Sequence, residues 1–391
     1  MRILHVLGKL DRGGVETWLV QALRAVDRRR YQMDFVVHTS EPGAYDNEVR
    51  SLGARILPCL GWSNPVHYAR NFRRVLRESG PYDVVHSHVH HYSGFVLLLA
   101  ATEGVPVRVA HAHNDTRPVD RRAGLARKTY FHAMKALLPT AGSGGFAASA
   151  EAGDSLFPRC WRASSRWPLL HYGIDLSRFQ GRIDHSALRR SLGIPDRALV
   201  VGHVGRFDRQ KNHGFLVEIA REFLDIAPHA VFLLVGDGGL RREIEEAVRR
   251  VGVAKSFIFT GVRPDVADLL RGAMDVLLFP SLFEGLPVTV LEAQAAGLPC
   301  LISDVITREA DVIPGLVVRQ SLARPAPDWA QALRRTACLL RVPPESACSL
   351  MQGRSINRST EELVLAYEKF ASLRARCRRG LAPTGVRRQN L

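Results

Sequence analysis

The sequence predicts an α/β protein with two successive parallel sheets, each covered by helices on both faces. Short apolar runs rich in Val, Ile and Leu alternate with amphipathic segments almost from end to end of the chain, which is typical of parallel strands joined by crossover helices. The plan begins again near residue 199. A length of 391 residues predicts two or three domains, and an apolar content of 46% suffices for their cores. We therefore expect two Rossmann-like, doubly wound domains.

Each half of the chain shows the same alternation of strand-like and helix-like segments. The segment 140–149, rich in Gly, Ala and Ser, receives no assignment. In the first half the expected strands are 3–7, 33–38, 55–58, 84–87 and 108–111, and the expected helices are 16–24, 47–52, 66–78 and 94–101. In the second half the expected strands are 199–204, 231–235, 257–260 and 276–279, and the expected helices are 215–223, 240–251, 287–296 and 363–373.

The composition excludes several classes of protein. No run approaches the roughly 18 apolar residues of a membrane span, and the chain opens on a strand rather than a signal peptide, so we expect a cytosolic protein. The six cysteines lack Cys-x-x-Cys spacing, which argues against a zinc ribbon or a disulfide framework. The formal charge of +16, carried mostly by arginine, favours anionic substrates or the anionic cytoplasmic leaflet as partners. Nucleic acid is disfavoured because no helix-turn-helix, zinc-finger or RNA-binding aromatic pattern occurs.

The most informative segment is 279–299, F-P-S-L-F-E-G-L-P-V-T-V-L-E-A-Q-A-A-G-L-P. It places Glu284 and Glu292 around a strand-to-helix turn, where Gly285 frees the backbone and Pro287 suits the first helical position. A helix N-terminus at the carboxyl edge of a parallel sheet is where open α/β proteins bind phosphates. Carboxylates beside such a site suit sugar and ribose hydroxyls. The alternative is a plain helix start with two acids that bind nothing.

This segment resembles the Glu-x7-Glu signature of retaining glycosyltransferases of the GT-B fold, in the large family four. The resemblance implies two Rossmann-like domains that face each other across a cleft. It also implies that Glu284 meets the donor sugar and that Glu292 binds the nucleotide ribose. The backbone N–H groups of Gly285 and Leu286 would hold the diphosphate.

A second site element follows the expected strand 199–204. The segment G-R-F-D-R-Q-K-N places Arg206 and Lys211 at the carboxyl edge of the second sheet, where two cations can neutralise a diphosphate leaving group. It matches the family element G-R-x-x-x-x-K-N, which implies donor-phosphate binding, and a surface loop with solvated cations is the alternative. The turn V-G-D-G-G-L, 235–240, is not a dinucleotide fingerprint because its glycine spacing differs from G-x-G-x-x-G.

Two further loops complete the expected donor site. The segment 259–266, F-T-G-V-R-P-D-V, resembles the family loop that cups the nucleotide base through backbone groups around Val262 and Arg263, with a purely structural turn as the alternative. In L-D-R-G-G-V-E-T, Gly13 and Gly14 let backbone N–H groups approach an anion. The family closes a G-G-x-E loop over the donor phosphates, although a tight strand-to-helix turn also favours glycine.

Histidines gather in two segments of the first half. The segment 110–115, A-H-A-H-N-D, resembles the A-H-x-H-N of polysaccharide-forming members of the family. The resemblance implies that His113, with His111 as its substitute, lies near the reactive carbon of the sugar and orients it or manages a proton. A core histidine bonded to backbone is the alternative.

We expect no metal and no cofactor other than a nucleotide-sugar co-substrate, linked to UDP or GDP. His86, His88 and His90 alternate along an expected strand and so would share one face, which invites a metal site. That site is disfavoured because Cys and carboxylate co-ligands at ligand spacing are missing. The chain also contains no Asp-x-Asp pair, through which the other common transferase fold binds its metal.

Two basic segments, 70–77 and 117–128, are predicted as helices in the half of the chain that binds the acceptor in the family. Basic residues mixed with Phe72, Leu76 and Leu125 would seat the protein on anionic lipid, where it would receive a polyprenyl-diphosphate-linked sugar. Simple solvated helix faces are the alternative. The protein would then be peripheral on the inner face of the cell membrane.

The boundary between the domains is expected in H-Y-G-I-D-L-S-R-F, 171–179, which resembles the family's hinge with Tyr172 in place of Asn. The C-terminal helix would pack back on the first domain, as in GT-B enzymes. The expected parts are an acceptor domain 1–175, a donor domain 176–359, the returning helix 360–375 and a disordered basic tail 376–391.

The resemblance covers roughly residues 1–375 and lies closest to bacterial capsule and exopolysaccharide glycosyltransferases. It implies a retaining, metal-independent hexosyltransferase that moves a sugar from a nucleotide-sugar donor to a lipid-linked glycan acceptor in surface polysaccharide biosynthesis. Two alternatives stay open, a nucleotide-sugar epimerase of the same fold and a non-catalytic nucleotide-binding assembly factor.

Overall fold

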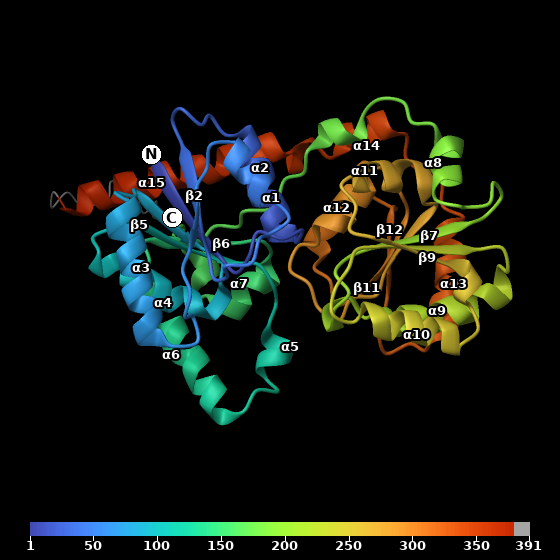
Figure 1. Ribbon diagram of the computed structural model, residues 1–391, viewed down its shortest axis with the longest axis horizontal. Helices are drawn as coiled ribbons and strands as arrows, with labels where there is room; N and C mark the ends of the chain where they lie inside the picture. Colours follow the sequence, from blue (N-terminus) through green and yellow to red (C-terminus); the bar gives the residue numbers. More distant parts are fainter. Residues whose placement is uncertain (379–391) are drawn as a thin grey trace, which may run out of the picture. The chain divides into compact units, whose positions relative to one another are not determined.

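The computed structural model describes residues 1–378, and its contacts divide the chain into two compact units (Figure 1). Unit 1 comprises Met1–Asp11, Leu19–His171 and the described chain from Ser359. Unit 2 comprises Arg12–Trp18 and Tyr172–Arg358. The short segment with the paired glycines therefore groups with unit 2. None of the helices within residues 1–378 combines the length and apolar character that crossing a bilayer requires.

Unit 1 is built on a parallel sheet in the order β3-β2-β1-β4-β5-β6. The order reverses between β1 and β4, the switch point outside which open α/β sheets bind ligands. The strands are β1 (Arg2–Leu7), β2 (Gln32–Val37), β3 (Ile56–Pro58), β4 (Val84–Ser87), β5 (Val107–Ala112) and β6 (Gly144–Ala147). The helices are α1 (Gly14–Ala25), α2 (Asp46–Ser51), α3 (Pro65–Ser79), α4 (Ser93–Thr102), α5 (Arg117–Asp120), α6 (Leu125–Ala141) and α7 (Ala150–Leu156).

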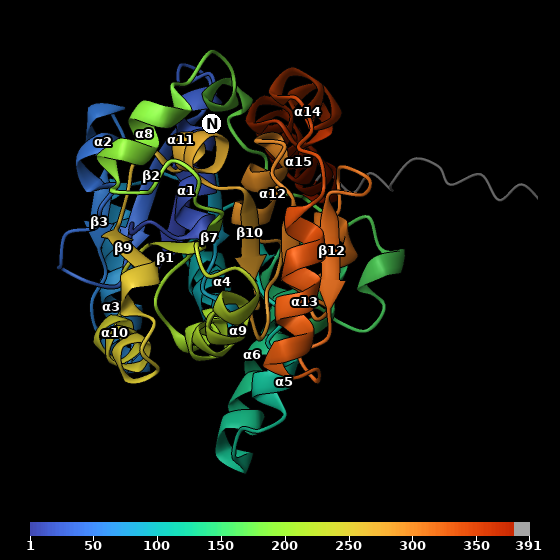
Figure 2. The same cartoon turned by 90° about the vertical axis from the view of Figure 1, so that its right-hand side faces the viewer.

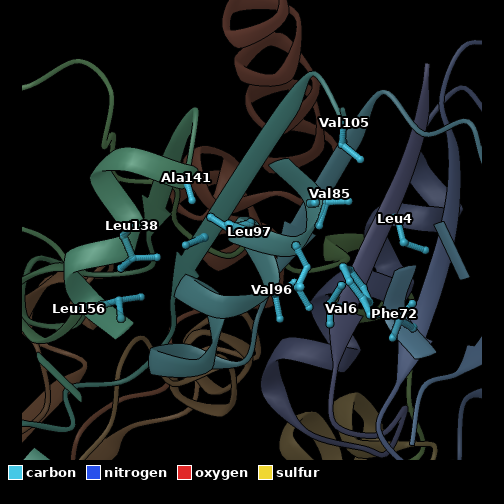
Figure 3. Packing of buried hydrophobic residues seen from close by; sticks show 14 of the residues in the cluster. Leu4, Val6, Phe72, Val85, Val96, Leu97, Val105, Leu138, Ala141 and Leu156 are labelled. Carbon is cyan, nitrogen blue, oxygen red and sulfur yellow. The ribbon is translucent and has the colours of Figure 1, made fainter. Parts of the chain in front are cut away.

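The two faces of this sheet have different cores. Leu4 and Val6 of β1 point toward α3 and α4, where they join Phe72, Val96 and other buried side chains (Figure 3). Because side chains alternate along a strand, the residues between them point to the opposite face. That face carries a cluster of buried histidines. It is covered by α15 (Ile356–Arg378).

Unit 2 repeats the plan with a parallel sheet in the order β12-β11-β10-β7-β8-β9. Helices α9, α10 and α13 share one face of this sheet, and Figure 2 shows α13 running alongside β10 and β12. The strands are β7 (Val200–Val204), β8 (Val231–Val235), β9 (Phe257–Gly261), β10 (Val276–Phe279), β11 (Cys300–Ser303) and β12 (Val317–Gln320). The helices are α8 (His185–Ser191), α9 (His213–Ile226), α10 (Arg241–Arg250), α11 (Val266–Asp268), α12 (Val288–Ala295), α13 (Ala326–Ala337) and α14 (Pro344–Leu350). The predicted fold class, two doubly wound parallel sheets, is confirmed.

The unassigned segment 140–149 contains the strand β6. A Cβ on Gly144 would lie 2.6 Å from the ring of Phe370, and one on Gly145 would lie 2.7 Å from the ring of Trp167. The strand is therefore made of small residues because large aromatic side chains press against its backbone. Its sequence lacks the apolar run by which strands are usually predicted.

The basic segment 117–128 is not the single helix that was predicted. Helix α5 ends at Asp120, and α6 begins only after Gly124, whose ψ of 165° is incompatible with a helix. The other basic segment does lie within α3, but its apolar residues do not face outward. Phe72 and Leu76 are buried in the core of unit 1 and are unavailable to lipid.

Among the element boundaries that differ from the predicted ones, those of α12 and α15 bear on the candidate site and on the predicted tail. Helix α12 starts at Val288, with Pro287 in an extended conformation as its cap rather than as its first helical residue. The last helix starts at Ile356, seven residues before the predicted 363. It continues to Arg378, so residues 376–378, predicted as the start of a disordered tail, are helical. The rest of that predicted tail, 379–391, lies outside the described residues.

Candidate active site

The centre of the site is an ion pair between loops at the carboxyl ends of the neighbouring strands β7 and β10. Lys211 Nζ lies 2.6 Å from Glu284 Oε1, and the two side chains are 15% and 6% exposed. The second carboxylate oxygen accepts a hydrogen bond of 3.0 Å from Gln210 Nε2, which also donates to the carbonyl of Phe283. The Lys211 ammonium further lies 4.5 Å from the centroid of the Phe279 ring. Glu284 is therefore held in one orientation by two donors.

The two loops are joined through their backbones as well. Asp208 caps the 3-10 turn Arg209–Lys211 by accepting from the backbone N–H of Lys211. The next residue, Asn212, is left-handed with φ of 56°, and its side-chain amide donates to the carbonyl of Pro280 at 3.1 Å. The N–H of Leu282 donates to the carbonyl of Gln210 at 2.8 Å. The position of the cation relative to the carboxylate is thus fixed by the chain on both sides.

Arg206 is an exposed cation beside this pair, on the loop that follows β7. A Cβ added to Gly13 would lie 3.3 Å from Arg206 Nη2, and one added to Gly14 would lie 3.5 Å from the side chain of Val288 in α12. The paired glycines therefore lie between an exposed guanidinium and the first residue of α12. This placement suits a loop whose N–H groups approach an anion.

The glycine turn after β8 packs against the backbone of the Arg206 loop. Gly236 has φ of +136°, and a Cβ there would lie 2.0 Å from the carbonyl oxygen of Gly205. The N–H of Phe207 donates to the carbonyl of Asp237 at 3.0 Å. These close backbone contacts explain the glycines without a dinucleotide fingerprint.

Glu292 lies on α12 and is partly buried. Burial away from water raises the pKa of its carboxyl to about 7. The positive charge of Arg178 opposes this effect and lowers the pKa, but by less. Arg178 also donates to the carbonyl of Pro264 at 2.6 Å, so it links Glu292 to the loop after β9. Arg178 was not among the predicted site residues, although it is the one basic residue of the hinge-like segment D-L-S-R-F.

The loop after β9 carries Val262, which is 52% exposed, and Arg263. The guanidinium of Arg263 donates two hydrogen bonds to the carboxylate of Asp265. The backbone carbonyl of Arg263 accepts a hydrogen bond of 3.1 Å from Arg12 Nη1. Unit 2 contains all the residues predicted to contact the donor apart from His113, namely Gly13, Gly14, Arg206, Lys211, Val262, Arg263, Glu284, Gly285, Leu286 and Glu292.

His113 and His111 belong to unit 1, where they form part of a buried histidine cluster. His113 Nε2 lies 2.8 Å from His88 Nδ1, and His88 Nε2 lies 3.0 Å from His5 Nδ1. The three rings therefore form a continuous hydrogen-bonded chain. His86 instead pairs through Nδ1 with the hydroxyl of Tyr367 on α15 at 2.6 Å.

The prediction that His90 shares a strand face with His86 and His88 is wrong. Strand β4 ends at Ser87, and His90 lies in a 3-10 turn with φ of 49°, so the alternation stops before it. The ring nitrogens of His5, His86 and His88 lie within 4.8 Å of one another, as do those of His88, His111 and His113. Neither of these sets within residues 1–378 includes a carboxylate or a thiolate.

Burial lowers the pKa of each histidine in this cluster. The pKa falls to about 3 for His5 and to about 3 for His113, with desolvation as the largest cause. The rings are therefore neutral at physiological pH. His113 can donate one hydrogen bond and accept another, but it does not carry a charge.

Comparisons with known proteins show the family of the chain. The family model described as Glycosyltransferase Family 4 matches residues 12–178, and the model described as Glycosyl transferases group 1 matches residues 198–337. The putative glycosyltransferase EpsF of Bacillus subtilis (strain 168) is 39% identical over 347 residues, which cover 86% of this chain and 88% of EpsF. The UDP-Gal:alpha-D-GlcNAc-diphosphoundecaprenol alpha-1,3-galactosyltransferase of Escherichia coli is 35% identical over 137 residues, 34% of this chain and 35% of that enzyme.

The fold also has solved counterparts. HepE of Anabaena, in a crystal structure with UDP and glucose, matches with a TM-score of 0.76 at 17% sequence identity, covering 94% of this chain and 100% of HepE. Likeness at that identity shows the fold. The extended identity to EpsF shows the family, and the chain therefore belongs to the glycosyltransferases, with the GT-B fold.

Proposed function

We propose that this glycosyltransferase moves a sugar from a UDP- or GDP-linked donor to a glycan acceptor, with retention of configuration, in surface polysaccharide biosynthesis. The observation that carries the proposal is the Lys211–Glu284 ion pair at 2.6 Å, with the exposed Arg206 on the same loop and the paired glycines beside it. The arrangement offers an anion site and a hydroxyl acceptor side by side. A sugar joined to a diphosphate requires both.

Each group has a distinct part in the proposed reaction. The bond between the anomeric carbon and the diphosphate breaks, and the acceptor hydroxyl oxygen bonds to the same face of that carbon while its proton passes to the leaving diphosphate. Arg206, Lys211 and the N–H groups at the start of α12 stabilise the charge on the leaving group. Glu284 accepts hydrogen bonds from sugar hydroxyls, and Glu292 accepts them from the ribose. These cations make a divalent metal unnecessary.

His113 acts as a neutral ring that orients the donor sugar. Its lowered pKa excludes a role as a cationic acid at neutral pH, and its bond to His88 limits which ring nitrogen carries the proton. The acceptor is proposed to be a lipid-linked glycan. Support comes from the Escherichia coli relative, whose name specifies a diphosphoundecaprenol acceptor.

A donor screen tests the proposal. Purified protein is incubated with UDP- and GDP-sugars, with and without a polyprenyl-diphosphate-linked acceptor, and release of nucleoside diphosphate and anomeric configuration of the product are measured. Retaining transfer is supported if nucleoside diphosphate is released only when acceptor is present and the new glycosidic bond has the same anomeric configuration as the donor. Conversion of the donor without acceptor would identify an epimerase. Nucleotide-induced thermal stabilisation without any turnover would identify a binding protein.

A further inference from the structure

Three apolar side chains are exposed at the start of α3, on unit 1. Leu60, Trp62 and Val66 are 45%, 60% and 72% exposed. They are rigidly presented, because Asn64 caps the helix by accepting from the N–H groups of Val66 and His67, and Asn71 Nδ2 donates to the carbonyl of Leu60 at 3.0 Å. Three exposed apolar side chains within seven residues of the chain, one of them an indole, make this segment a candidate contact surface.

A stripe of arginines continues from these side chains along α3. Val66, Arg70, Arg73 and Arg77 follow helical spacing on one face, and Arg74 lies beside them. They border a groove of about 950 Å³ between α3 and α4, two helices that lie side by side (Figure 1). The apolar part of its lining includes Ala69, Phe95 and Leu98.

The arginines divide into two pairs. Arg73 and Arg77 share one carboxylate, that of Glu103, at 3.4 and 2.7 Å, which offsets part of their charge. Arg70 and Arg74 have no carboxylate within 4.0 Å in the part of the chain that the structure describes. Arg70 and Arg74 thus follow the exposed Trp62 and Val66 along the chain without a carboxylate partner among residues 1–378. Exposed apolar side chains next to unpaired cations are typical of surfaces that bind an anionic bilayer.

We propose that this face, made of Leu60, Trp62, Val66, Arg70 and Arg74, docks on an anionic lipid bilayer. Trp62 and Val66 enter the boundary between headgroups and acyl chains, where an amphipathic indole is favoured. Arg70 and Arg74 contact lipid phosphates. This surface differs from the one predicted from the sequence, because it uses the loop before α3 in place of the buried Phe72 and Leu76.

The proposed docking face and the histidine cluster lie on opposite sides of the sheet of unit 1. The core beneath α3 contains Leu4 and Val6, whereas His5 points to the other face of the same strand. Substitutions on the outer surface of α3 therefore leave the histidine cluster intact. They also leave the donor site intact, since its residues belong to unit 2. Failure of the docking proposal is thereby distinguishable from failure of the proposed transferase reaction.

The chain provides its own reporter for this binding. Of its five tryptophans, Trp18, Trp161, Trp167 and Trp329 are buried, and only Trp62 is exposed. The full chain is mixed with vesicles of phosphatidylglycerol and phosphatidylcholine whose acyl chains carry bromine, which quenches indole fluorescence on contact. We expect quenching that disappears in Trp62→Phe, a change that keeps an apolar ring. Vesicles of phosphatidylcholine alone should give little quenching.

Flotation of the vesicles measures the energetic contribution of each group. Trp62→Ala with Val66→Ser should abolish binding, and Arg70→Gln with Arg74→Gln should weaken it about 25-fold, roughly fivefold for each arginine. The matched control is Arg249→Gln with Arg250→Gln on α10, which removes the same charge from another exposed helix and should leave most binding intact. Nucleotide-induced thermal stabilisation should be equal in the wild type and in these three double variants.

Three results would overturn the proposal. One is quenching that persists in Trp62→Phe, since it would place a different tryptophan at the membrane. Another is equal binding to neutral and anionic vesicles. The third is vesicle binding that is unchanged in Trp62→Ala with Val66→Ser while sedimentation shows a dimer breaking into monomers, which would identify the face as an interface between two copies of the chain.

Discussion

The ammonium of Lys211 lies 2.6 Å from the carboxylate of Glu284. The cation predicted to bind the donor phosphates and the carboxylate predicted to bind the donor sugar therefore form one largely buried ion pair. Each group neutralises the other while no donor is bound. A donor that supplies a diphosphate to Lys211 and hydroxyls to Glu284 therefore replaces one set of charge-assisted bonds with another. The pair also makes the two residues interdependent, so substituting either one changes the environment of the other.

Glu284→Gln should lose most of the turnover and still bind donor nucleotide, because the amide keeps a carbonyl oxygen for Lys211 and Gln210 but accepts hydroxyl protons weakly. Steady-state transfer and nucleotide affinity by calorimetry measure the two effects. Unchanged transfer in this variant would remove Glu284 from the mechanism.

Lys211→Ala should reduce the transfer rate about a hundredfold, since one charge-assisted contact to a leaving group contributes roughly 3 kcal/mol. It should also destabilise the fold, because the buried Glu284 carboxylate loses its counter-charge. Arg206→Ala provides the comparison. The Arg206 side chain is exposed, so its removal should slow transfer with little change in the denaturation midpoint. Near-normal rates in both variants would show that the diphosphate binds elsewhere.

The protonation of Glu292 should control nucleotide affinity near neutral pH. Its pKa is raised to about 7 by burial, so the carboxyl is protonated below that pH and becomes a hydroxyl-accepting carboxylate above it. Affinity of the wild type relative to Glu292→Gln should therefore rise between pH 6 and pH 8. The ratio is used because the diphosphate itself titrates in this range. A flat ratio would contradict the assignment of the ribose to Glu292.

The same raised pKa predicts an effect on stability with the opposite sign. A carboxyl that is harder to ionise in the folded state favours folding most at low pH, and this contribution is lost as the pH rises from about 4.5 through about 7. Glu292→Gln should thus raise the denaturation midpoint more at pH 8 than at pH 4. Equal effects at both pH values would mean that Glu292 is already ionised in the free protein.

Transfer should be the same with excess chelator as with added magnesium, because the proposed phosphate site consists of Arg206, Lys211 and the start of α12. Metal-depleted protein assayed in EDTA, with magnesium and manganese added back, measures this. Complete loss of activity on chelation would instead direct attention to the imidazoles of His5, His86 and His88, which lie close enough to share an ion.

Much of the chain's organisation was determined by the sequence alone. Apolar runs predicted nine of the ten strands from β1 to β10, all except the Gly-rich β6, because buried parallel strands need continuous Val, Ile and Leu. Arg206, Lys211 and Glu284 were predicted as donor-site residues through the resemblance of their loops to family four, and the strand order places the carboxyl ends of β7 and β10 side by side. Strands β11 and β12 were not predicted, although they are as long as β4 and β10, which were.

Other features were decided only by tertiary structure. Nothing local to Gly144 and Gly145 predicts a strand, because the segment is a strand through its pairing with β5. The rings of Phe370 and Trp167, which are distant in sequence, leave room only for small residues there. His5 meets His88 because β1 and β4 pair side by side, which no single segment of the sequence shows. The alternation within residues 86–90 therefore suggested His90 as the third histidine of the cluster in place of His5. Whether an apolar residue of α3 faces lipid or the core depends on which side the sheet lies. Packing against that sheet buries Phe72 and leaves Val66 exposed, because a helix covers its neighbour with one face only.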